Sequence, residues 1–157
     1  MNIKEIIEEF KGLFYEKCYV YKDDTLILSK KGKHSYIKFT DYEIERVKNS
    51  DLLIHSHPVE DWSLSNSDIG FALECNIKTI IAITPKNVCI FKIKDRFNLA
   101  FLEDINERWY TLRNYKYFYI DIATDDLNHH VLLELVSDFP DYFEYQKISI
   151  REFKGKV

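Results

Sequence analysis

Residues 55–68 read His-Ser-His-Pro-Val-Glu-Asp-Trp-Ser-Leu-Ser-Asn-Ser-Asp, and this stretch says most about how the chain is built. The apolar run before His55 indicates a buried strand, in which residues two apart point to the same side. His55 and His57 would therefore direct two imidazoles to one point. Asp68 lies at the start of a predicted helix, so the chain could fold back and add a carboxylate. Two histidines, one carboxylate and an open fourth position form the ligand set of a catalytic zinc site.

Each half of this pattern also has a simpler interpretation. A His-x-His pair in a strand often serves packing or surface chemistry. Ser65 and Asp68 have the spacing of a helix capping box, with Ser65 as the N-cap and Asp68 as the third helical residue. The capping and metal-binding roles are compatible, because Ser65 can cap the helix while Asp68 turns inward. The two halves together, joined by a short loop, favour the metal site.

The spacing also carries a family resemblance. His-x-His, seven residues, Ser, two residues and Asp are matched without a gap by His55, His57, Ser65 and Asp68. This pattern resembles the signature of the JAMM/MPN-plus zinc metallopeptidases, also called the JAB domain family. The resemblance implies that His55, His57 and Asp68 are the ligands of a zinc ion.

Neighbouring features resemble the bacterial and phage branch of that family, which includes RadC-like proteins. They are Pro58 after the second histidine, the Ser-Asp-Ile start of the helix and the strand that follows at 79–84. The resemblance covers roughly residues 10–95 and is weak or absent beyond them. It implies an α/β sandwich of the JAB/MPN, cytidine-deaminase-like kind.

The family also uses a glutamate on an early strand as its general base, and Glu16 fits that place best. Glu16 begins a predicted strand at 15–21, whereas Glu8 and Glu9 fall in a predicted helix at 3–14. A surface carboxylate is the alternative interpretation of Glu16.

The resemblance implies hydrolysis of a peptide or isopeptide bond. Zinc lowers the pKa of a bound water to about 7, and Glu16 would accept its proton and pass it to the leaving amine. The Ser65 hydroxyl would donate a hydrogen bond to the developing oxyanion. Trp62, in the loop between Pro58 and Leu64, is a candidate substrate contact, and a hydrophobic plug over that loop is the alternative.

Apolar patterning along the chain predicts strands and helices that interleave. Strands are predicted at residues 15–21, 25–29, 35–39, 51–55, 77–84 and 88–93, with a weak edge strand at 142–150. Helices are predicted at residues 3–14, 42–48, 66–74 and 98–117, and from a cap at Asp125 or Asp126 to 136. This order predicts an α/β fold with a mixed, partly antiparallel sheet flanked by helices and a helical C-terminal extension.

Composition is consistent with one domain of this kind. The 157 residues are 46% hydrophobic and 15% aromatic, and no repeat or linker divides them. We expect a single domain over 1–157, with a JAB-like core at about 10–95 and the extension at about 96–157. The net charge of −4 argues against nonspecific nucleic-acid binding. Three separated cysteines favour a reducing cytoplasm, and no apolar stretch is long enough to cross a membrane.

Two functions from different classes remain open. The favoured one is a zinc-dependent peptidase or isopeptidase acting on a protein or peptide, with a ubiquitin-like conjugate as one candidate substrate. The alternative is a catalytically silent JAB domain that serves as a protein-interaction module. The intact set of His55, His57 and Asp68 favours the first, whereas a Glu16 far from the metal would favour zinc binding without hydrolysis.

Overall fold

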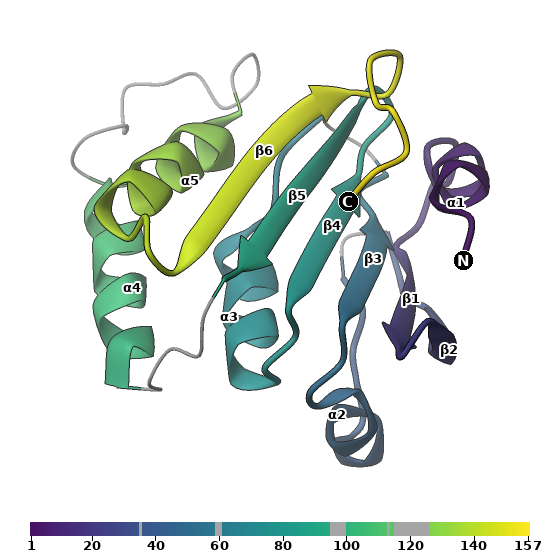
Figure 1. Ribbon diagram of the computed structural model, residues 1–157, viewed down its shortest axis with the longest axis horizontal. Coiled ribbons are helices and arrows are strands. Elements are labelled where there is room, and N and C mark those ends of the chain that lie inside the picture. Colours follow the sequence, from purple (N-terminus) through teal and green to yellow (C-terminus); the bar gives the residue numbers. More distant parts are fainter. Residues whose placement is uncertain (35, 59–60, 95–99, 113, 115–125) are drawn as a thin grey trace.

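The computed structural model describes residues 1–34, 36–58, 61–94, 100–112, 114 and 126–157, and six strands within them form one sheet (Figure 1). The strands are β1 (Lys17–Lys22), β2 (Thr25–Lys31), β3 (Leu52–Ser56), β4 (Thr79–Ile83), β5 (Asn87–Ile93) and β6 (Phe143–Ser149). Their order across the sheet is β2-β1-β3-β4-β5-β6. The pair β3–β4 is parallel and the other four neighbouring pairs are antiparallel, so the predicted mixed α/β class is confirmed.

Helices cover both faces of this sheet (Figure 1). They are α1 (Ile3–Phe10), α2 (Asp41–Val47), α3 (Asn66–Glu74), α4 (Ala100–Thr111) and α5 (Leu127–Asp138). One face packs on the buried side of α1, and the other packs on residues of α2 to α5. The central strands are therefore buried on both sides, which explains their unbroken aliphatic runs. None of the described helices combines the length and apolar character that a membrane span requires.

The first helix is shorter than predicted. It ends at Phe10, and Lys11 and Gly12 follow in a turn, because glycine is unfavourable in a helix. Phe14, the last residue of the predicted helix and in helical spacing with Phe10, is 84% exposed. The periodicity therefore predicted the buried face correctly through Phe10 and was wrong for Phe14.

Residues 36–39 do not form the predicted strand, and Ser35 lies outside the described residues. Ile37 and Phe39 are half-buried against the core, and the ring of Phe39 stacks on Phe71 of α3 with centroids 4.8 Å apart. The alternation in this segment thus reflects side-chain packing on a helix rather than strand pairing.

The C-terminal third joins the same sheet and core. Asp126 caps α5, and β6 pairs with β5 from Phe143 to Ser149, at the edge of the sheet where a strand was predicted. Phe143 belongs to the same buried cluster as Val20 of β1 and Ile69 of α3. The helical extension is therefore followed by a strand, and both are built into the fold. The alternative cap, Asp125, lies outside the described residues.

The topology brings three chain segments to one end of the sheet. Parallel strands β3 and β4 are connected through α3, so the carboxyl end of β3 and the amino end of α3 lie close together. Strand β1 runs antiparallel to β3, with Cys18 opposite His55, so its first residues lie beside the last residues of β3. The residues predicted to form the site come from these three segments.

Candidate metal site

The three predicted ligands converge in the structure. His55 lies near the carboxyl end of β3, and His57 follows that strand with its backbone N–H bonded to the Ile83 carbonyl at 2.8 Å. The two Nε2 atoms are 2.9 Å apart. Asp68 lies 3.4 Å from His55 Nε2 through Oδ1 and 3.3 Å from His57 Nε2 through Oδ2. Because the ligand atoms all lie within 4.8 Å of one another, this group could hold a metal ion.

The spacing of the donor atoms fits a tetrahedral ion. With metal–nitrogen bonds of about 2.0–2.1 Å, neighbouring ligand atoms in such a site lie about 3.3 Å apart. His57 Nδ1 is 2.9 Å from the Trp62 carbonyl and donates to it, which leaves the lone pair on Nε2. His55 Nδ1 is buried without a hydrogen-bond partner among the described residues, so the polar neighbours of that ring face its Nε2.

The electrostatics of the site favour a positive charge at its centre. Burial alone would lower the pKa of His57, but the hydrogen bond and charge of Asp68 outweigh burial and raise this pKa to about 9. Burial alone would raise the pKa of Asp68, but the imidazoles of His55 and His57 hold it well below its usual range. Asp68 therefore stays ionised inside the cavity, as a metal ligand must.

Ser65 and Asp68 also form the predicted capping box at the start of α3. The Ser65 hydroxyl oxygen accepts from the Asp68 N–H at 3.2 Å, and Asp68 Oδ2 accepts from the Ser65 N–H at 2.8 Å. The carboxylate that closes the helix end also faces the two histidines, so the capping role is compatible with a place in the candidate metal site. Ser65 lines the same cavity as the histidines.

Glu16 lines that cavity as well. It precedes β1, and the Cys18–His55 register continues toward a position beside His57. Residues 16 and 18 share one face of the strand, as residues 55 and 57 do, so Glu16 lies on the face of the histidines. Burial raises the pKa of the Glu16 carboxyl, by more than the charges of His55 and His57 lower it. A raised pKa suits a group that takes up a proton near neutral pH.

The cavity beside the histidines has a volume of about 700 Å³, in the usual range for ligand sites. Its walls include Phe39, Phe71 and Trp62. Trp62, one of these walls, is 37% exposed. Its role as a substrate contact stays a prediction, as does the alternative that it plugs the loop. Glu60, in the same loop, lies outside the described residues.

Sequence reasoning missed several residues around the site. His34 lines the cavity, and its charge lowers the pKa of Glu16. Ser56, between the two histidines, hydrogen-bonds to the chain on both sides of Glu16. A buried polar cluster around Asp126 holds the loop that contains Trp62, although only a helix cap was predicted for Asp126. No local pattern marks these residues, because their partners are distant in the sequence.

Comparisons of the chain with protein-family models, with curated proteins and with solved structures found no match. Its function is therefore inferred from the site itself and from the resemblance of the motif.

Proposed function

We propose that the chain is a zinc-dependent metallopeptidase or isopeptidase of the JAMM type, which hydrolyses a peptide or isopeptide bond in a protein substrate. The observation that carries this proposal is the convergence of Glu16 with His55, His57 and Asp68 at one cavity. Two imidazoles and one carboxylate suit zinc, and zinc bound there would activate a water and polarise the scissile carbonyl. A ubiquitin-like conjugate is one candidate substrate.

Three residues around the ion would transfer the proton, stabilise the oxyanion and contact the substrate. Glu16 accepts a proton from the attacking water and then donates it to the leaving amine, and its raised pKa supports both steps. The Ser65 hydroxyl donates a hydrogen bond to the oxyanion that develops on the scissile carbonyl. Trp62 contacts the substrate from the cavity wall.

A catalytically silent domain that serves as a protein-interaction module is the second candidate, and the apolar walls of the cavity suit it. The place of Glu16 supports the enzyme instead, because a module that only binds protein has no need of a carboxyl with a raised pKa beside the ligands. The three cysteines are buried and free, which supports action in a reducing compartment such as the cytoplasm.

The first test is the zinc content of the purified protein, measured by elemental analysis. We expect about one zinc per chain in the wild type and in Glu16→Gln, and its loss in His57→Ala. His130→Ala, which removes a histidine outside the cluster, should keep the metal. Wild-type protein that takes up no metal even after zinc is added back would overturn the proposal.

The second test is hydrolysis by the zinc-loaded protein, measured on matched peptide-linked and isopeptide-linked protein conjugates. We expect Glu16→Gln to lower the rate by about 10²–10⁴-fold with its zinc retained. Equal rates for Glu16→Gln and the wild type would remove Glu16 as the base. Zinc binding with no hydrolysis of either type of conjugate would favour the silent module.

A further inference from the structure

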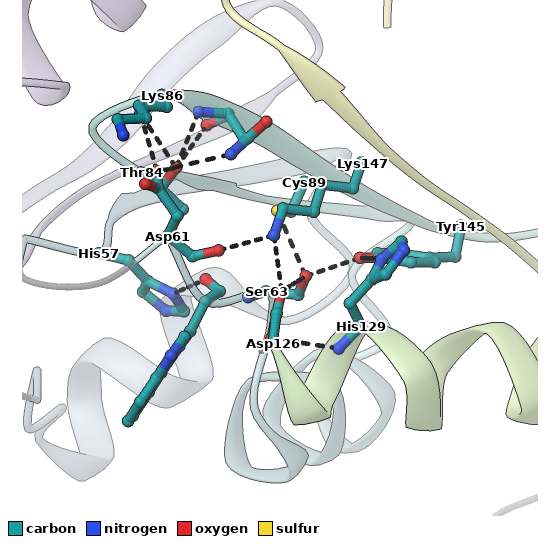
Figure 2. Close-up of polar contacts among 12 residues, drawn as sticks. His57, Asp61, Ser63, Thr84, Lys86, Cys89, Asp126, His129, Tyr145 and Lys147 are labelled. Carbon is teal, nitrogen blue, oxygen red and sulfur yellow. Dashed lines mark hydrogen bonds and ion pairs between the residues drawn. The ribbon is translucent and has the colours of Figure 1, made fainter. Parts of the chain in front are cut away.

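A buried polar cluster ties the loop before α3 to the C-terminal third of the chain (Figure 2). Asp126 at the start of α5 accepts hydrogen bonds from the Ser63 backbone N–H at 2.7 Å, from the Ser63 hydroxyl and from Lys147 Nζ at 2.9 Å. Lys147 on β6 also donates to the Asp61 carbonyl at 2.7 Å. The hydroxyl of Tyr145 lies 2.7 Å from that of Ser63. The cluster therefore holds the backbone of the loop before α3 at two points, Asp61 and Ser63.

Trp62 lies between these two anchored residues. Its carbonyl accepts the hydrogen bond from His57 Nδ1 at 2.9 Å, which directs Nε2 of that ring toward His55 and Asp68. A carbonyl can orient a ring only if its own peptide is held in place. Lys147 and Asp126 hold the peptides on either side of Trp62.

A second set of contacts anchors the same loop from the other side. The Asp61 carboxylate accepts from the Thr84 hydroxyl at 2.7 Å and from the Lys86 N–H at 2.9 Å, just beyond the end of β4 (Figure 2). The loop is thus held between the β4–β5 turn and the C-terminal cluster. A shift of the Trp62 carbonyl would require breaking one of these sets of contacts.

Disrupting the cluster costs free energy because its side chains are largely shielded from solvent. Ser63 is fully buried, and the side chains of Asp126 and Lys147 are 9% and 17% exposed. Removing one partner of such an ion pair leaves the other charge uncompensated. The loop is therefore held in one position more firmly than an exposed ion pair would hold it.

We propose that Lys147 and Asp126 are positioning residues of the metal site, which fix the Trp62 carbonyl so that His57 presents Nε2 to the ion. Neither residue belongs to the ligand group, and both act through the backbone of the loop. This inference rests on the proposed zinc site. It assigns the C-terminal third, which lies outside the family motif, a part in metal binding.

The test is the dissociation constant of zinc, measured by competition with a chromophoric chelator. Lys147→Met removes the donor to Asp61 and Asp126, and we expect zinc binding to weaken by about 10–100-fold, as is typical when a partner of a metal ligand is lost. Lys147→Arg keeps a charged donor and should restore most of the affinity. Lys78→Met is the control, because Lys78 donates to Asp51 at the same 2.9 Å at the opposite end of the sheet.

A second readout separates positioning from a general loss of stability. In metal-free protein, the Nδ1 proton of His57 should be visible by nuclear magnetic resonance through its hydrogen bond to Trp62, and Lys147→Met should broaden or shift it while Lys78→Met leaves it in place. If Lys147→Met does not fold, Asp126→Asn, which keeps a helix-capping side chain but removes the charge that faces Lys147 and the Ser63 N–H, decides by the same two measurements.

The wild type is measured first, so that failure of the zinc site and failure of the positioning role are distinguished. No zinc binding by the wild type would overturn both proposals. Unchanged affinity and an unchanged His57 signal in the folded Lys147→Met or Asp126→Asn variant would overturn only the positioning role. Equal weakening by Lys78→Met would overturn it as well, because stability alone would then explain the effect.

Discussion

Ser56, the residue between the two histidines, links these candidate metal ligands to the proposed base. It is fully buried at the end of β3, where it donates a hydrogen bond to the Tyr15 carbonyl and accepts one from the Lys17 N–H, both at 2.9 Å. These two contacts lie directly before and after Glu16. Ser56 therefore holds the backbone of Glu16 next to His55 and His57.

We predict that Ser56→Ala keeps zinc but lowers hydrolysis by roughly 10²-fold, because small displacements of a reacting group have effects of this size. Zinc content and the rate on the same conjugate check it. Ser50→Ala is the matched control, because Ser50 is equally buried and bonds to the Val47 carbonyl away from the site. An equal loss of rate in both variants would contradict the role of Ser56.

The pair of His57 and Asp68 makes the stability of the metal-free protein depend on pH. The pKa of His57 is about 9 in the folded state and near 6.5 when unfolded. A raised pKa contributes stability that is fully present below about 6.5 and is lost as the pH rises through 9. We therefore expect the free energy of unfolding of the wild type to exceed that of His57→Gln more at pH 6 than at pH 9.5.

Urea unfolding of chelator-treated protein at these two pH values measures the difference. The depressed pKa of Asp68 acts in the opposite direction, since its contribution is present above its unfolded pKa and is lost in acid. A gap between the two proteins that is constant from pH 6 to pH 9.5 would show that folding does not raise the pKa of His57 in the metal-free protein.

Helices α2 and α3 both begin with a capping box, but the acidic residue of each box has a different second contact. Thr40 and Glu43 form a capping box on α2, as Ser65 and Asp68 do on α3. In α2 the glutamate also pairs with Lys30 of β2, whereas in α3 the aspartate faces His55 and His57. The same local pattern is thus structural in one element and part of the candidate site in the other.

This pair of helices allows a matched experiment on the proposed oxyanion donor. We predict that Ser65→Ala and Thr40→Ala each lower the free energy of unfolding by about 1 kcal/mol through loss of the cap. Hydrolysis should fall a further 10²–10³-fold, as an estimate for an oxyanion donor, only in Ser65→Ala. Denaturant unfolding and initial rates measure the two effects, and equal rates in both variants would leave Ser65 with the cap alone.

Across the molecule, the sheet and the larger of its two core clusters join the segment that carries the candidate ligands to the C-terminal third. Phe143 on β6 is 1% exposed, and its ring lies 5.2 Å from that of Phe91 on β5 and 6.2 Å from that of Phe139. Lys147, which holds the metal-site loop, lies on the same strand. The C-terminal third therefore supports both the core and the site.

We predict that Phe143→Ala destabilises the protein by about 3–5 kcal/mol and that unfolding remains a single transition. Leu133→Ala is the control, because Leu133 is 48% exposed on α5 and should change stability by less than about 0.5 kcal/mol. Calorimetry and denaturant unfolding followed by two probes test the expectation. Two separate transitions would show that the C-terminal third is a unit of its own.

Much of the ligand set could be predicted because it is local. His55, His57 and Asp68 lie on one strand, one loop and one helix start, so side-chain alternation and capping chemistry bring them together over a short span. The same local rules predicted α3 and the β4–β5 hairpin. Where a local pattern had two meanings, as for residues 36–39, the prediction was wrong because packing on Phe71 produces the same alternation as a strand.

The α/β class, the group of His55, His57 and Asp68 that could hold a metal ion, and the capped helix that completes this group could all be predicted from residue patterns. The side chains that hold this group in place become apparent only from the fold. Ser56 bonds to residues 39 and 41 positions away, and Lys147 reaches Asp61 across 86 positions. Such contacts depend on strand order and on how helices pack on the sheet, and neither property leaves a periodic signal in the residues that make the contact.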